Sequence, residues 1–121
     1  MTILPFLCEE ERESWLAFCE MAVFPSSYEP FGIAVQESMA AGAAVAAGIN
    51  GGWNDFVIDR VTGFRIDFSD PHKAANALAE IVGNKEQLLK VGQTAKAYIF
   101  DLHDPGYVKN MFLHHVYHTS F

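Results

Sequence analysis

Residues 24–37 of the chain read FPSSYEPFGIAVQE. The apolar run Ala22–Phe24 ends at Pro25, a pattern that is typical of a buried parallel strand. Ser26–Pro30 has the composition of a loop, and Gly32–Ala41 that of a helix. A loop between a strand and a helix lies at the carboxyl end of that strand, which is where open α/β sheets bind their ligands. These residues therefore predict both a fold class and the place of a site.

The same alternation of apolar runs and amphipathic segments continues on both sides of this stretch. Further strands are predicted over Ile3–Leu7, Ala44–Ala47 and Phe64–Phe68, and further helices over Glu9–Met21, Trp53–Ile58, Pro71–Val82, Lys85–Phe100 and Val108–Val116. Asp70 before Pro71 is a helix start signal, with Asp as the N-cap and Pro at the first helical position. We therefore predict an α/β domain with about four mostly parallel strands and flanking helices.

Composition excludes several classes of protein. The chain has 121 residues, 50% of them hydrophobic, which allows at most one folded domain. Fifteen acidic and eight basic residues give a net charge of −7, which argues against a nucleic-acid binder or an electrostatic membrane anchor. No membrane span or signal peptide is visible. Cys8 and Cys19 are interpreted as reduced core thiols, so a soluble, cytoplasmic protein is expected.

The loop before the second helix has the composition of an anion site. A helix that begins at Gly32 offers unpaired N–H groups to an anion such as phosphate. Glu29 lies just before that helix and Glu37 within it, and carboxylates accept hydrogen bonds from hydroxyls. No Lys or Arg lies between Arg12 and Arg60, so backbone amides, the helix dipole or groups from elsewhere must hold the anion. A phosphate flanked by hydroxyl-binding acids describes a nucleotide sugar.

An ordinary structural reading of these glutamates is also open. A glutamate before a helix is commonly a solvated partner of the helix dipole, and one inside a helix is commonly a surface residue. Glu37, however, has apolar neighbours and no cation on its own helix. A bare carboxylate in such surroundings is costly, so Glu37 has either a function or a partner that the local sequence does not show.

Together these residues resemble a known family. The stretch from Glu29-Pro30-Phe31-Gly32 to Glu37 resembles the E-x7-E signature of retaining glycosyltransferases with the GT-B fold, particularly family 4. The resemblance extends over roughly residues 3–100 and includes these further segments: Val45-Ala46-Ala47, Gly51-Gly52, Thr62-Gly63-Phe64 and Asp70-Pro71. Three positions depart from the family pattern: Ala44 replaces a proline, Asp55 replaces a glutamate, and Arg60-Val61 stands where Asp-Gly is expected.

The resemblance implies roles for five residues. Glu29 would contact the donor sugar and is the candidate catalytic residue. The backbone amides of Phe31, Gly32 and Ile33 would face the donor sugar and the diphosphate, and Glu37 would bind the ribose. The reaction implied is hexosyl transfer from a nucleotide-diphosphate sugar to an acceptor hydroxyl with retention of configuration. No metal and no further cofactor are implied.

The resemblance also implies that residues 1–121 form a single incomplete Rossmann-like domain, the second half of a GT-B C-terminal domain. Little or no transferase activity is then expected from the isolated chain, since positioning and phosphate neutralisation need other parts. In the strand order 3-2-1-4-5-6 the strand Ile3–Leu7 lacks its neighbour, and Ala22–Pro25 has a bare edge. Either the first strand moves to that edge, or another chain pairs with it, most simply in a symmetric dimer. The alternative function is therefore a non-catalytic truncated paralogue that serves as an oligomerisation or partner-assembly module.

Two further patterns leave alternatives open. His114 and His118 are one helical turn apart, which suits a metal, whereas His115 falls on an apolar face and no third ligand is evident. Trp53 beside the glycine pair has the shape to stack on a base or a sugar, but packing is the commoner role of such a residue.

Overall fold

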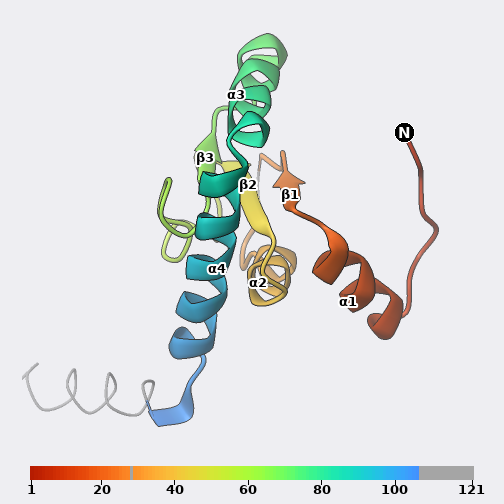
Figure 1. The fold of residues 1–121 in the computed structure, drawn as a ribbon, viewed down its shortest axis with the longest axis vertical. Helices are drawn as coiled ribbons and strands as arrows, with labels where there is room; N and C mark the ends of the chain where they lie inside the picture. Colours follow the sequence, from red (N-terminus) through yellow and green to blue (C-terminus); the bar gives the residue numbers. More distant parts are fainter. Residues whose placement is uncertain (28, 107–121) are drawn as a thin grey trace, which may run out of the picture.

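The computed structural model describes residues 1–27 and 29–106. Figure 1 shows the fold. In chain order the elements are α1 (Glu9–Phe18), β1 (Met21–Phe24), α2 (Ile33–Ala40), β2 (Ala44–Gly48), β3 (Phe64–Ile66), α3 (Pro71–Gly83) and α4 (Lys85–Leu102). The alternation of strands and helices confirms the predicted α/β class.

The three strands of the described residues form one parallel sheet in the order β1-β2-β3. Ala22 of β1 pairs with Val45 of β2, and Ala47 of β2 pairs with Arg65 of β3. Every residue of β2 is buried, which is why this strand reads as an unbroken run of small apolar residues. Among the described strands β1 lies at the edge of the sheet. The prediction of a parallel strand at Ala22–Phe24 is confirmed, but that of a buried one is wrong, because none of its residues is buried at this edge.

The predicted strand over Ile3–Leu7 is wrong, and the count of four strands falls to three. These residues form no regular element, and β1 pairs with β2 alone among the described strands. The first strand has therefore not moved to the bare edge. A strand is stable only when its backbone groups pair with a neighbour, and Pro5 removes one of the donors. Without that neighbour the apolar side chains stay in water, as shown by Phe6, which is 98% exposed.

Some of the predicted helix boundaries match the structure, and others differ from it. Asp70 caps α3 as predicted, and its carboxylate accepts hydrogen bonds from the amides of His72 and Lys73 at 3.0 and 3.2 Å. α1 ends at Phe18, three residues earlier than predicted, because Met21 already belongs to β1. The segment predicted as a short helix over Trp53–Ile58 is a hydrogen-bonded turn.

The core lies on both sides of β2. Val45 and Ala47 pack with α2 and the second half of α4, while Ala44 and Ala46 pack with α3 and the first half of α4. α4 thus changes from one cluster to the other along its length, and Figure 1 shows it running along the long axis of the molecule. It crosses the sheet at Gly92, where a Cβ atom would lie 2.4 Å from the carbonyl oxygen of Gly42.

α1 is the exception to this packing. It lies to one side of the sheet in Figure 1, and none of its residues is buried. Cys8 is exposed and Cys19 is half-buried, so the expectation of core thiols is wrong, although both are free as expected. The apolar face of α1 has no complete core to pack against among the described residues, so its side chains keep contact with water. The predicted helix over Val108–Val116 and the three histidines His114, His115 and His118 lie outside the described residues.

Candidate functional site

The α2 helix begins at Gly32, which acts as its N-cap in the left-handed conformation with φ of 62°. A Cβ atom at this position would lie 3.1 Å from the ring of Phe56 and 3.6 Å from Trp53. Glycine is thus required twice, for the positive φ and for the close packing of the aromatic rings. The rings of Phe56 and Trp53 therefore occupy the space that a side chain at the helix start would need.

The loop between β1 and α2 is held by the glycine pair. The amide of Gly52 donates a hydrogen bond of 2.6 Å to the carbonyl oxygen of Glu29. A Cβ atom on Gly52 would lie 2.2 Å from the carbonyl oxygen of Pro30, a distance that no side chain tolerates. The loops that follow β1 and β2 therefore touch through their backbones, and this contact sets the path of the chain into α2.

The first turn of α2 presents free donors. In the described part of the chain, the amides of Phe31, Gly32 and Ile33 have no hydrogen-bond acceptor. The side chains of Phe31 and Ile33 are exposed. Nε2 of the Gln36 side chain donates to the Phe31 carbonyl at 3.2 Å, and Oε1 of the same side chain lies 2.7 Å from Nε2 of His103. Sequence reasoning did not identify Gln36, whose link to the end of α4 depends on tertiary structure.

The two candidate glutamates have different surroundings. Glu29 is half-buried, and its carboxylate has no hydrogen-bond or ionic partner among residues 1–27 and 29–106. Glu37 lies in α2, one turn after the first helical residue Ile33. Its Oε1 accepts a hydrogen bond of 3.2 Å from Nη2 of Arg12. The partner that Glu37 lacked in the local sequence is therefore a cation of α1. Nothing in the sequence indicates a pair separated by 25 positions.

Both members of this ion pair keep part of their surface in water. The Arg12 and Glu37 side chains are 42% and 39% exposed. The guanidinium contacts Oε1, so Oε2 of Glu37 remains an acceptor for another group. Nε of Arg12 is buried without an acceptor, which shows that the guanidinium is only partly satisfied by this contact.

Trp53 is a core residue. It is fully buried, and its Nε1 donates a hydrogen bond of 2.8 Å to the carbonyl oxygen of Gly48. The alternative that it stacks on a ligand is wrong, because no face of the indole is open. By packing under Gly32 and Gly51 it supports the two loops of the site.

A hollow of about 270 Å³ opens where the three strands end. Its lining comes from the residues that follow β1, β2 and β3, namely Pro25–Ser27, Gly48–Asn50 and Asp67–Ser69. The hydroxyl and the amide of Ser69 donate hydrogen bonds to Asp67 and lower the pKa of its carboxyl group, while Lys73 adds a smaller electrostatic effect. This carboxylate was not identified from the sequence.

Arg65 stabilises the connection between β2 and β3. Its guanidinium donates to the Ile49 carbonyl, to Oδ1 of Asn54 at 2.5 Å and to the Val57 carbonyl at 3.4 Å. The Arg65 amide donates to Oδ1 of Asp59 at 2.8 Å. Because it is engaged with this loop, Arg65 is a structural cation.

Neither a cluster of metal-binding side chains nor a membrane-spanning helix occurs in the described residues. Residues 1–27 and 29–106 contain no group of three or more His, Cys, Asp or Glu side chains that could hold a metal ion. No helix in the same part of the chain is long and apolar enough to cross a membrane.

The arrangement of strands and helices is that of known sugar-transferring enzymes. Sucrose-phosphate synthase from Thermosynechococcus elongatus superposes with a TM-score of 0.81 at 24% identity, over 98% of this chain and 31% of that chain. HepE from Anabaena, solved in complex with UDP-glucose, gives 0.70 at 22% identity, over 84% of this chain and 28% of that one. The likeness confirms a Rossmann-like fold of the kind found in GT-B glycosyltransferases.

Sequence comparison then defines the family. Residues 1–98 match the model of glycosyl transferases group 1, and the chain belongs to this family. An uncharacterized glycosyltransferase of Bacillus subtilis, YqgM, is 36% identical over 110 residues, which cover 91% of this chain and 31% of that protein. A D-inositol 3-phosphate glycosyltransferase of Nocardioides sp. is 32% identical over 99 residues, 80% of this chain and 22% of that protein. The chain thus spans less than a third of the length of these relatives.

Proposed function

We propose that this chain carries part of the donor site of a retaining glycosyltransferase of family 4 type, which binds a nucleotide-diphosphate sugar. The observation that carries the proposal is the start of α2, where three amides lack acceptors among the described residues, with Glu29 before the helix and Glu37 within it. Family membership and the UDP-glucose complex of HepE, a protein with this fold, support this class of ligand.

Each part of the ligand has a matching group. The amides of Phe31, Gly32 and Ile33, at the positive end of the α2 dipole, would receive the diphosphate and the sugar. The unpartnered Glu29 carboxylate would accept hydrogen bonds from sugar hydroxyls and is our candidate for the catalytic residue. Oε2 of Glu37 would accept a hydrogen bond from the ribose while Arg12 holds Oε1.

In the whole protein the reaction would be hexosyl transfer to an acceptor hydroxyl with retention of configuration. We expect residues 1–121 to form one incomplete domain that corresponds to the second half of a C-terminal donor-binding domain. The net charge of −7 opposes the binding of a diphosphate, so the isolated chain would bind the donor weakly and transfer little or no sugar.

Titration with UDP-glucose, GDP-mannose and ADP-glucose, followed by calorimetry or NMR, tests the proposal. We expect binding in the millimolar range or tighter for at least one donor, and a loss of at least tenfold in affinity in Glu37→Gln and in Glu29→Gln. Glu80→Gln, on the exposed side of α3, is the matched control and leaves the affinity unchanged. Absence of binding by all three donors, or equal affinity in all variants, contradicts the proposal.

The bare edge of β1 supports a second candidate, assembly with another copy of this chain. Val23 of this strand and Phe18 of the adjoining helix are exposed, and unpaired strand edges are templates for pairing. Light scattering at high concentration tests this function. A dimer that Val23→Lys dissociates supports assembly, and a clean monomer contradicts it.

A further inference from the structure

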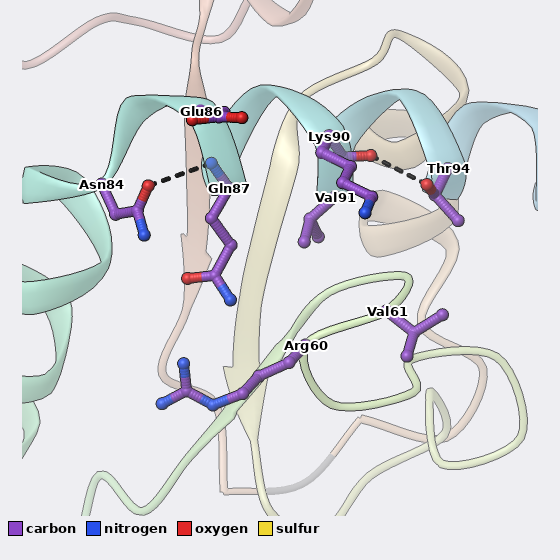
Figure 2. A pocket seen from close by; sticks show the side chains of 8 residues that line it. All are labelled: Arg60, Val61, Asn84, Glu86, Gln87, Lys90, Val91 and Thr94. Atoms are coloured by element: carbon purple, nitrogen blue, oxygen red, sulfur yellow. Dashed lines mark hydrogen bonds between the residues drawn. The ribbon is translucent and has the colours of Figure 1, made fainter.

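The described residues enclose a hollow of about 550 Å³ between α4 and the turn that precedes β3. Figure 2 shows its lining. The turn contributes Arg60 and Val61, and the first half of α4 contributes most of the remainder: Asn84, Glu86, Gln87, Lys90, Val91 and Thr94. A hollow of this volume accommodates a small organic molecule.

This hollow lies at the opposite end of β3 from the candidate donor site. Arg60 and Val61 precede β3, whereas the loops around Glu29 and Gly52 follow β1 and β2. In a parallel sheet the two sets of loops are at opposite ends of the strands. The hollow therefore shares no residue with the donor site proposed above.

Two cations of the hollow have no partner. In the described part of the chain, the Arg60 guanidinium and the Lys90 ammonium group make neither an ion pair nor a hydrogen bond. Arg12 pairs with Glu37, and Lys85 lies 3.8 Å from Glu20, whereas the exposed Lys73 and Lys96 also lack an ion-pair partner in the described residues. The hollow differs from these single lysines in that it brings two such cations to one place.

Polar groups accompany these cations. Figure 2 shows the Gln87 carboxamide extending from α4 toward the Arg60 guanidinium, while Glu86 lies across the helix and not between the two cations. Asn84 caps the helix, with its Oδ1 accepting from the Gln87 amide at 3.1 Å. The Thr94 hydroxyl donates to the Lys90 carbonyl at 2.8 Å, which leaves its oxygen free to accept a hydrogen bond.

We propose that this hollow binds a small organic phosphate. The phosphate group would lie against the Arg60 guanidinium, which forms charge-assisted hydrogen bonds with a dianion, while Lys90 adds positive charge to the same hollow. The Gln87 carboxamide and the Thr94 oxygen would face the hydroxyls of the organic part. Repulsion from the overall negative charge is screened beyond about 8 Å at physiological salt, so the local cations decide the binding.

The backbone of Arg60 allows a test that separates binding from folding. Arg60 has φ of 61°, in the left-handed region that disfavours residues other than glycine. Arg60→Gly therefore removes the cation and relieves the backbone, so we expect the variant to melt at a higher temperature than the parent chain. Lost binding in a more stable protein cannot come from unfolding.

The experiment is an NMR titration of the chain with glycerol 3-phosphate at constant ionic strength. We expect saturable shifts, confined to the amides around Arg60 and over Asn84–Thr94, with half-saturation below about 10 mM. Arg60→Gly and Lys90→Gln should each weaken binding at least fivefold. Lys73→Gln, which removes an exposed cation outside the hollow, is the matched control and should leave binding unchanged.

Further ligands define the chemistry. Glycerol alone should produce no shifts, and inorganic phosphate should bind more weakly than glycerol 3-phosphate. Succinate, a dicarboxylate of similar charge, should bind at least fivefold more weakly. Unsaturable shifts, equal binding of succinate, or equal loss in Lys73→Gln would overturn the proposal.

Discussion

The two tryptophans of the chain show two different fates of an apolar side chain. Trp53 is fully buried under the loops of the candidate site and donates a hydrogen bond to Gly48. Trp15 sits on the apolar side of α1 and is 45% exposed. Both belong to segments that read as amphipathic, but only the first lies against a completed core. An amphipathic pattern states what a segment can bury, and the neighbouring elements decide whether it does.

Replacing each tryptophan by alanine gives the largest contrast. We expect Trp53→Ala to lower the free energy of unfolding by about 3–5 kcal/mol, since it empties a buried site and leaves the Gly48 carbonyl without a donor. Trp15→Ala should cost less than about 1 kcal/mol, because a half-exposed side chain loses little burial. Urea unfolding followed by far-UV circular dichroism measures both, and equal losses would show that α1 is packed in solution.

Two helical glycines, one packed against the backbone and one open to space, give a second comparison between a covered and an uncovered position. Gly92→Ala should cost about 3 kcal/mol, because the new methyl group would collide with the backbone of Gly42, which cannot rotate away. Gly83→Ala is the matched control: nothing lies within 4 Å of its Cβ position, so the higher helix propensity of alanine should stabilise the protein by up to about 1 kcal/mol. The same unfolding assay applies. A small cost at Gly92 would mean that α4 can slide over the sheet.

The ion pair between Arg12 and Glu37 joins α1, which carries Trp15, to α2, which packs in the core with Trp53. A double-mutant cycle with Arg12→Ala and Glu37→Gln should give a coupling of about 0.5 kcal/mol at low salt, because both side chains are partly exposed and screened by water. The coupling should decrease in 0.5 M NaCl. A coupling above about 2 kcal/mol would show that α1 holds Glu37 far more firmly than the packing indicates.

The smallest effect concerns Asp67 at the ends of the strands. Ser69→Ala removes the hydroxyl donor and should raise the pKa of Asp67 toward its ordinary value of 3.8. Because the pKa is lower in the folded state, the Asp67 contribution to stability is present above the unfolded-state pKa. It is lost as the pH falls through the folded-state value. An NMR titration of the Asp67 carboxyl carbon measures the change, and an unchanged pKa would assign the lowering to the Ser69 amide and Lys73.

Much of the fold can be predicted from local sequence. The run at Ala44–Ala47 predicts a strand, and Asp70-Pro71 predicts the start of α3, and both are confirmed. These signals work because an apolar run and a helix cap are each formed by residues next to each other in the chain. Ile3–Leu7 has the same apolar character but forms no strand, since pairing depends on a neighbour that local sequence cannot supply.

The candidate site divides in the same way. The loop, the helix start at Gly32 and the two glutamates follow from their spacing in the sequence, although their roles stay predictions. The ion-pair partner of Glu37 does not follow from the sequence, since Arg12 lies on α1, 25 positions earlier in the chain. The contact of Gly52 with the Glu29 carbonyl and the burial of Trp53 are likewise tertiary.

The sequence by itself determined the class of fold, the order of most elements and the position of the loop between β1 and α2, because periodicity, capping and turn chemistry act over a few residues. Tertiary structure alone decided which apolar faces are covered, which cation meets Glu37 and which cations stay unpaired around the hollow at Arg60 and Lys90. These outcomes depend on which side chains distant segments bring together, and the energy of such contacts exists only once the chain has folded.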